Sequence, residues 1–166
     1  EIQTDPNFGN YRIRIAGEQG GDSETDRIVL LDFGAVQSYS SDFLQPVIQM
    51  IRASYEEDLE QVVEGGIKLR FMSRDWPAEV LDKFGKVCMS VLEPLAKDRS
   101  QWPDYAVNSH GQYRWKQSDL PSRVAKQAAR SAISRYFRVP PKEFVFLNRK
   151  LIGVYTFIAV LHSEFN

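Results

Sequence analysis

The pattern of hydrophobic and polar positions divides the chain into a short extended part and a long helical part. Residues 11–15 alternate between large apolar and charged side chains, which predicts a β-strand. Residues 27–31 form an apolar run with β-branched members, which predicts a buried strand. The segment 16–26 between them is rich in Gly, Ser, Asp and Glu, as is typical of a solvated hairpin loop. A hairpin would place the start of the first strand beside the end of the second.

Beyond residue 40 the apolar positions recur with the period of helices. Ser41 or Asp42 is expected to cap the first helix, and the pair Gly65-Gly66 is expected to end the second. Residues 100–117 are polar and aromatic without a clear period, which predicts a long loop. The helices are expected from near residue 42 to residue 55, and at about 59–63, 77–95, 121–138 and 141–162. The pattern predicts a mainly α fold with a small β hairpin, in one domain of residues 1–166 with a helical bundle at 41–166.

Composition adds little to this outline. An apolar fraction of 43% and a charged fraction of 26% are ordinary for a globular domain, and one cysteine excludes an internal disulfide. The net charge of −1 gives no general attraction to nucleic acid, and none is expected as a partner. Residues 97–166, however, hold 12 basic and 5 acidic side chains, which indicates a surface suited to an anionic partner.

Candidate chemistry is concentrated in residues 1–36. Asp5 is followed five positions later by Asn10, and Asp32, Phe33 and Gly34 follow the second predicted strand. This order is the metal and phosphate half of a kinase-type active site. Asn10 and Asp32 offer the hard oxygen ligands that Mg²⁺ prefers, and Asp5 could accept a proton from an attacking hydroxyl or orient a water.

Each motif alone is also explained without any function. Asp, Asn and Pro favour turns, and an isolated Asp-Phe-Gly is common where a strand ends in a turn. The two motifs in this order, separated by a strand-like pair of segments, indicate a phosphoryl-transfer site much more specifically than either motif alone. Gly34 lets the backbone turn sharply after Asp32. We therefore expect Gly34, with Asn10 and Asp32, to contribute to nucleotide binding.

The segments QTDPNFGNY and RIVLLDFGAV resemble the UbiB/AarF family of atypical kinases, in particular the subgroup linked to coenzyme Q biosynthesis, and FVFLNRKLIGVYTFIAVL resembles that family's carboxy-terminal helix. The resemblance implies a protein-kinase-like C-terminal lobe and the use of ATP with Mg²⁺ or Mn²⁺. It matches Asp5 to the catalytic-loop aspartate, Asn10 to the metal-binding asparagine and Asp32 to the metal-binding aspartate.

The chain departs from the family in two ways. Many members carry His where Gln3 and Asn7 stand, which leaves the choice between base and water-orienting group open for Asp5. No Gly-rich loop and no phosphate-gripping lysine precede Asp5, so we expect the N-terminal lobe to be absent from residues 1–166, and this piece alone to bind ATP weakly and to be inactive. Only about seven residues separate Gly34 from the first helix, and no Ala-Pro-Glu follows, which favours a small-molecule kinase or an ATPase over a kinase of peptides.

Alternatives are a phosphotransferase of the aminoglycoside-kinase type and a non-catalytic pseudokinase scaffold. Expected partners are a nucleotide, a lipid or quinone precursor, a membrane surface, and a second copy of the fragment covering an apolar patch. The basic face of 121–138 could contact anionic lipid, although a solvated face is the favoured interpretation. The resemblance implies a cytoplasmic or membrane-peripheral location in bacteria, or a mitochondrial one in a eukaryote. The three tryptophans are expected to pack over helix ends.

Overall fold

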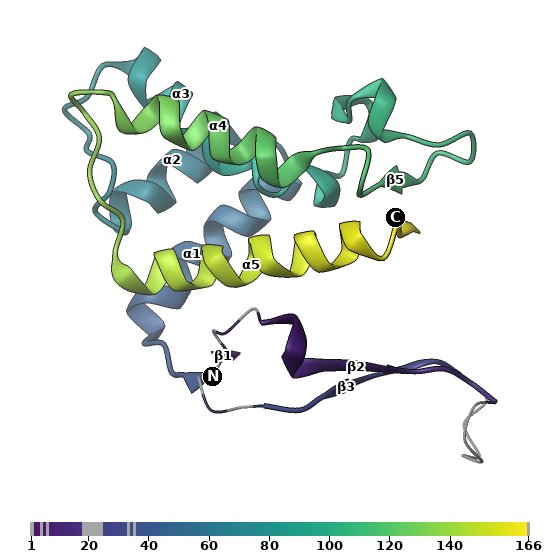
Figure 1. Cartoon of the computed structure of the whole chain (residues 1–166). Helices are drawn as coiled ribbons and strands as arrows, with labels where there is room; N and C mark the ends of the chain where they lie inside the picture. Colours follow the sequence, from purple (N-terminus) through teal and green to yellow (C-terminus); the bar gives the residue numbers. More distant parts are fainter. Residues whose placement is uncertain are drawn as a thin grey trace.

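The computed structural model describes residues 2–3, 5, 7–17, 25–32, 34 and 36–165. Within this part of the chain, helices dominate and the strands form three separate antiparallel pairs (Figure 1). The α-helices are α1 Ser41–Tyr55, α2 Leu59–Lys68, α3 Ala78–Ser90, α4 Leu120–Ala132 and α5 Lys142–Val160. The strand pairs are β1 Ile2–Gln3 with β4 Val36–Gln37, β2 Tyr11–Arg14 with β3 Arg27–Leu30, and β5 Tyr113–Arg114 with β6 Glu164–Phe165. The mainly α fold with a small β hairpin is confirmed.

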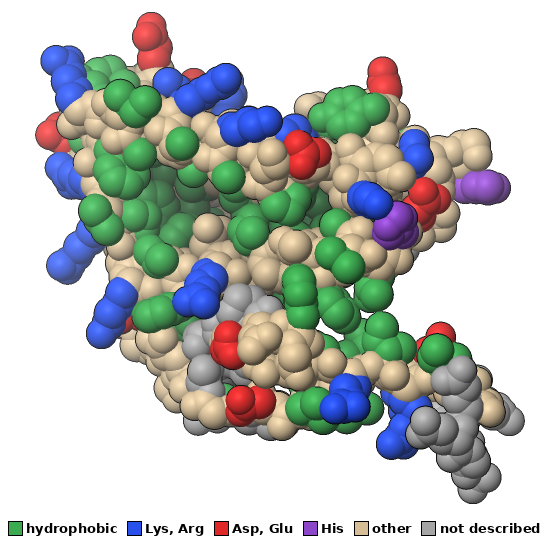
Figure 2. Space-filling view, viewed as in Figure 1, with side chains coloured by type: hydrophobic (Ala, Val, Ile, Leu, Met, Phe, Trp, Pro, Cys, Tyr) green, Lys and Arg blue, Asp and Glu red, His purple; other side chains and the backbone are tan. Residues whose placement is uncertain are grey.

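The predicted hairpin is β2–β3, with Tyr11 opposite Leu30 and Arg14 opposite Arg27. Its loop is described only at 16–17 and 25–26, so the expectation for 18–24 lies outside the described residues. The prediction that the second strand is buried is wrong, since Ile28 is 60% exposed. The hairpin projects from the bundle as a two-stranded ribbon, so its apolar side chains remain accessible, as Figures 1 and 2 show.

Helices α1, α2 and α3 pack in sequence order around the first core, whose buried members include Phe43, Met50, Val62 and Met72. Helix α1 is capped one residue earlier than predicted, because the Ser40 hydroxyl accepts a hydrogen bond from the Phe43 amide at 3.3 Å. The cap fixes the direction in which α1 leaves the hairpin end.

The prediction that Gly65-Gly66 ends the second helix is wrong, because α2 continues to Lys68. Both glycines are buried, and a Cβ on Gly65 would lie 2.3 Å from Cγ of Met50. A Cβ on Gly66 would lie 2.7 Å from Sδ of Met72. The glycines therefore serve close packing of α2 against its neighbours rather than a turn, and tight packing outweighs their low helix propensity.

The prediction of a long loop at 100–117 is in part wrong. It contains the 3₁₀ turns η3 Arg99–Gln101 and η4 Asp104–Ala106 and ends in β5, which pairs with β6 at the far end of the chain. Its rings form a second core with α5, and the successive ring centroids are 5.0–5.3 Å apart. The rings in this chain of contacts are Trp102, Tyr113, Trp115 and Tyr155. Packing of the tryptophans is confirmed, since Trp76 is buried in the first core.

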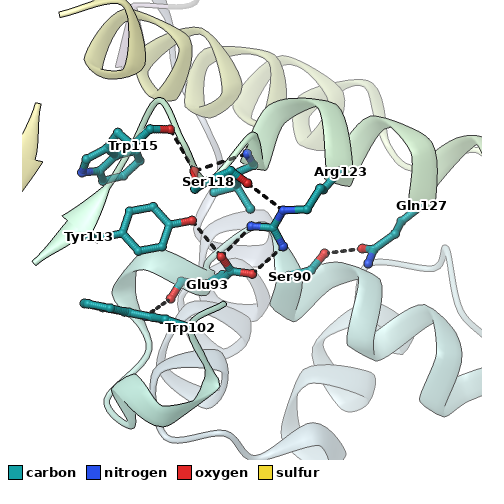
Figure 3. A network of polar contacts seen from close by, with 9 residues as sticks. Ser90, Glu93, Trp102, Tyr113, Trp115, Ser118, Arg123 and Gln127 are labelled. Carbon is teal, nitrogen blue, oxygen red and sulfur yellow. Dashed lines mark hydrogen bonds and ion pairs between the residues drawn. The ribbon is translucent and has the colours of Figure 1, made fainter. Parts of the chain in front are cut away.

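A polar network joins this aromatic segment to the helices (Figure 3). Glu93, in the 3₁₀ turn η2 Glu93–Leu95, accepts two hydrogen bonds from the Arg123 guanidinium at 2.7 and 2.9 Å. It also accepts one from the Tyr113 hydroxyl at 2.7 Å, and its backbone carbonyl accepts one from the Trp102 indole at 2.9 Å. Burial raises the pKa of Tyr113, while the hydrogen bonds that Arg123 donates to Glu93 raise the pKa of Arg123. Tyr113 is therefore a neutral donor, and Arg123 a fixed cation.

Helix α4 ends at Ala132 rather than near 138, because 3₁₀-type bonds from Ser134 to Ser131 and from Phe137 to Ser134 replace the helical pattern. Ile133 and Phe137 are consequently exposed, whereas Val124, within the helix, is buried. None of the described helices combines the length and the apolar character needed to cross a bilayer.

Candidate functional site

The Asp5 carboxylate is held by the loop that follows it. Its Oδ1 accepts a hydrogen bond from the Asn7 amide at 3.2 Å, and its Oδ2 accepts one from Nδ2 of Asn10 at 3.0 Å. Asn10 is buried, with 9% of its surface exposed, and Asp5 is half-buried. Because the Asn10 amide nitrogen is directed to Asp5, its carbonyl oxygen is the atom that can bind a cation.

Asn7 has a structural role in this loop, at a position where the resembled family often has His. Its side chain caps the 3₁₀ turn η1 Phe8–Asn10 by accepting a hydrogen bond from the Gly9 amide at 3.0 Å. Its carbonyl accepts a second one from the Asn10 amide at 3.0 Å. Asn7 thus fixes the turn that carries Asn10.

Asp32 is placed by the register of the hairpin. The Leu31 amide donates to the Asn10 carbonyl at 2.9 Å, so Asp32 is the first residue beyond the last paired position. Its Oδ1 accepts a hydrogen bond from the Gly34 amide at 2.7 Å, and within the described part of the chain no hydrogen bond reaches Oδ2. A Cβ on Gly34 would lie 3.1 Å from this Oδ1, so glycine suits the tight turn.

The structure therefore joins Asp5 to Asn10 directly and Asn10 to the residue before Asp32 through the backbone. Among the described residues no hydrogen bond links Asp32 to Asp5 or Asn10, and no group of three His, Cys, Asp or Glu side chains is placed to hold a metal. Phe33, the middle residue of the second motif, lies outside the described residues. Shared coordination of one cation by Asn10 and Asp32 stays a prediction.

Helix α5 supports this loop from a distant part of the chain. The Phe157 ring packs on Phe8 with centroids 5.6 Å apart and stacks on Tyr11 at 5.4 Å. Lys150 donates to the Tyr11 hydroxyl at 2.5 Å and lies over the same ring. The two aromatic residues flank Asn10 in sequence, so α5 holds both sides of the turn that presents it. These contacts join residues 8–11 to residues 150–157, so the local sequence of the loop does not show them.

Replacing Phe157 by Ala is expected to loosen the turn that carries Asn10. Each aromatic pair contributes about 0.5–1.5 kcal/mol beyond its burial, so loss of both should speed local opening by about tenfold or more. Native-state hydrogen exchange at the amides of Asn10 and Leu31 measures this opening.

Val160→Ala is the matched control, since Val160 lies on the same helix with its side chain exposed. It should leave exchange at Asn10 and Leu31 unchanged. Equal exchange rates in the Phe157 variant and the unaltered chain would remove α5 from any role in positioning Asn10.

The basic face predicted at 121–138 is only in part free for an anionic partner. Arg123 is paired with Glu93, and the Arg135 guanidinium lies over the Tyr136 ring. The Arg138 guanidinium lies over Trp76 with 5.4 Å to the ring centroid. These contacts tie three cations of this face to neighbouring side chains of the fold. They favour the interpretation that the face is solvated and covers an apolar core.

Comparison with known proteins agrees with the motifs. Residues 1–65 match the family described as the ABC1 atypical kinase-like domain. The chain is 29% identical over 165 residues, 99% of its length, to the protein of Dictyostelium discoideum named "Probable serine/threonine-protein kinase abkA". It is 26% identical over 98% of its length to "Atypical kinase COQ8B, mitochondrial" of Rattus norvegicus, and 28% identical over 98% to "Atypical kinase coq-8, mitochondrial" of Caenorhabditis elegans.

The chain spans only part of these relatives, 27% of the Dictyostelium and rat proteins and 19% of the nematode protein. The resemblance to the UbiB-type atypical kinases is confirmed, and the helical fold with its hairpin is consistent with the C-terminal lobe of a kinase.

Proposed function

From this confirmed resemblance to ABC1-type atypical kinases, we propose that the chain is the catalytic-loop part of a protein that uses ATP with Mg²⁺ or Mn²⁺, either transferring the phosphate or hydrolysing the nucleotide. The observation that carries the proposal is the bond between Asp5 and Asn10, with Asn10 paired through its backbone to Leu31. These two contacts support the proposal that Asp5, Asn10 and Asp32 share one end of the hairpin.

The donor chemistry of these residues fits a divalent cation. The Asn10 carbonyl oxygen and the Asp32 carboxylate would hold it, with Gly34 allowing the turn beyond. Bound there, the cation would neutralise charge on the phosphate oxygens. Asp5, fixed by its two hydrogen bonds, would accept the proton of an attacking hydroxyl or orient a water.

A small molecule is the favoured phosphate acceptor. Only six residues, 35–40, separate Gly34 from the start of α1, which leaves no room for a long activation segment that would support a peptide. Quinone-lipid synthesis is the proposed setting, on the strength of the subgroup that the sequence resembles. Relatives whose names include "mitochondrial" support a mitochondrial location for a eukaryotic source.

Two other functions make different demands. An aminoglycoside-kinase type of enzyme would phosphorylate an aminoglycoside, whereas a pseudokinase scaffold would need none of Asp5, Asn10 and Asp32. The presence of Asp5, Asn10 and Asp32 together supports chemistry over a scaffold, because a scaffold needs none of them.

The test uses the full-length protein that contains this chain. We expect ADP to form with Mg²⁺ and ATP, to stop when EDTA removes the metal, and to resume when Mg²⁺ is restored in excess. Phosphate found on a quinone-precursor lipid would show transfer, and free phosphate alone would show hydrolysis. Phosphorylation of an aminoglycoside instead would favour the first alternative, and no ADP under any condition would favour the scaffold.

A further inference from the structure

A groove of about 540 Å³ lies between α3 and α4 and is rich in hydrogen-bond donors. Lys83 and Lys86 line it from α3, and Gln127, Arg130 and Ser131 line it from α4. Helix α5 lies between these helices and the hairpin (Figure 1), so the groove is separate from the candidate site around Asn10.

The cations that line the groove are not paired with carboxylates elsewhere in the described structure. In the part of the chain that the structure describes, Lys83, Lys86 and Arg130 form none of the ion pairs. This sets Arg130 apart from Arg123 on the same helix, which is neutralised by Glu93. Figure 2 shows Lys and Arg side chains gathered along the surface over α4.

Two polar groups add directional donors to this charge. The Ser90 hydroxyl lies 2.7 Å from Oε1 of Gln127 (Figure 3) and 2.7 Å from the Val87 carbonyl oxygen, and among the described residues Nε2 of Gln127 donates no hydrogen bond. Ser131 is only 5% exposed, and its hydroxyl has no hydrogen-bond partner within the described structure. A buried hydroxyl without a partner costs free energy, and a ligand acceptor in the groove would recover it.

Two carboxylates, Glu79 and Asp82, also line the groove, so its charged lining is three cations against two anions. Their position on α3 indicates which end an anion would occupy. Glu79 stands in the first turn of α3 and Asp82 three residues later, and Lys86 follows them by seven and four residues, about 10 and 6 Å along a helix. Gln127, tied to Ser90, marks the Lys86 end as the donor-rich end.

We propose that the donor-rich end of this groove binds a phosphate group. Lys83, Lys86 and Arg130 would supply the charge, and Gln127 Nε2 and the Ser131 hydroxyl would donate hydrogen bonds to the phosphate oxygens. A phosphorylated small molecule and a phospholipid headgroup share this chemistry. The site does not depend on the function proposed above.

The first test titrates inorganic phosphate into the ¹⁵N-labelled chain at constant ionic strength. Saturable shifts are expected at the amides of Lys86, Gln127 and Ser131. Lys86→Met and Arg130→Met should each weaken binding by about tenfold, as expected for loss of one charged hydrogen bond. Lys126→Met is the matched control, because Lys126 is exposed on α4 outside the groove and carries the same charge.

Ser131→Ala separates a ligand-binding hydroxyl from a structural one. It should weaken phosphate binding while leaving the phosphate-free chain at least as stable to urea. A less stable chain with unchanged phosphate affinity would overturn the proposal, as would equal losses in the Lys126 and Lys86 variants, or the absence of saturable shifts.

The source of the phosphate follows from sedimentation with phosphatidylcholine vesicles that contain or lack phosphatidic acid. Binding only with phosphatidic acid, reduced by Arg130→Met and not by Lys126→Met, would identify a headgroup. Saturable phosphate binding without vesicle binding would identify a soluble phosphorylated molecule.

Discussion

Asp32→Asn in the full-length protein is expected to lower Mg²⁺-dependent ATP turnover by at least about 100-fold, as for removal of one preorganised charge-stabilising group. The substitution keeps the side-chain oxygen that accepts the hydrogen bond from the Gly34 amide at 2.7 Å, so the turn after β3 should persist. What it removes is the negative charge that a divalent cation requires. The initial rate of ADP formation across a Mg²⁺ titration measures the effect.

Asp26→Asn is the matched control, since Asp26 accepts a similar hydrogen bond, from the Ala16 amide at 2.9 Å, at the far end of the same hairpin. Its turnover should equal that of the unaltered protein. If the Asp32 variant kept the same rate and the same Mg²⁺ requirement, Asp32 would not belong to the site, and the kinase-type interpretation of the hairpin end would lose its principal ligand.

Glu93→Ala is expected to lower the free energy of unfolding of the chain by about 3 kcal/mol, near the lower end of the range for breaking a buried ion pair. The Glu93 side chain is 13% exposed and that of Arg123 is 27% exposed, so the cation left behind would be poorly solvated. The Tyr113 hydroxyl, in a fully buried residue, would lose its acceptor as well. Urea unfolding gives the change, and the near-ultraviolet circular dichroism of the packed tryptophans reports on the aromatic segment.

Glu64→Ala provides a comparison with the same bidentate geometry in a different environment. Arg74 binds Glu64 through two contacts of 2.7 Å, but the Arg74 side chain is 70% exposed. An exposed pair contributes at most about 1 kcal/mol, so this variant should be close to the unaltered chain in stability. Equal losses for the two glutamate variants would show that the network around Glu93 adds nothing beyond a surface ion pair.

The hairpin and the motif at its end were predictable because each depends on local sequence. Alternation over residues 11–15 specifies a strand, and the register then brings Asn10 next to Leu31 whatever the rest of the chain does. The contact between Asp5 and Asn10 lies within one short loop for the same reason. The exposure of Ile28 was not predictable, because burial of an apolar strand depends on whether another segment packs against it.

The sequence by itself determined the order of the elements, the helical period after residue 40 and the motif that identifies the candidate site. The tertiary structure alone decided that α2 passes through Gly65 and Gly66, that β5 pairs with β6, and that Phe157 supports the loop around Asn10. Periodicity and turn chemistry arise from interactions between neighbouring residues. Close packing and aromatic contacts arise between segments far apart in the chain, and their partners are set only when the whole fold forms.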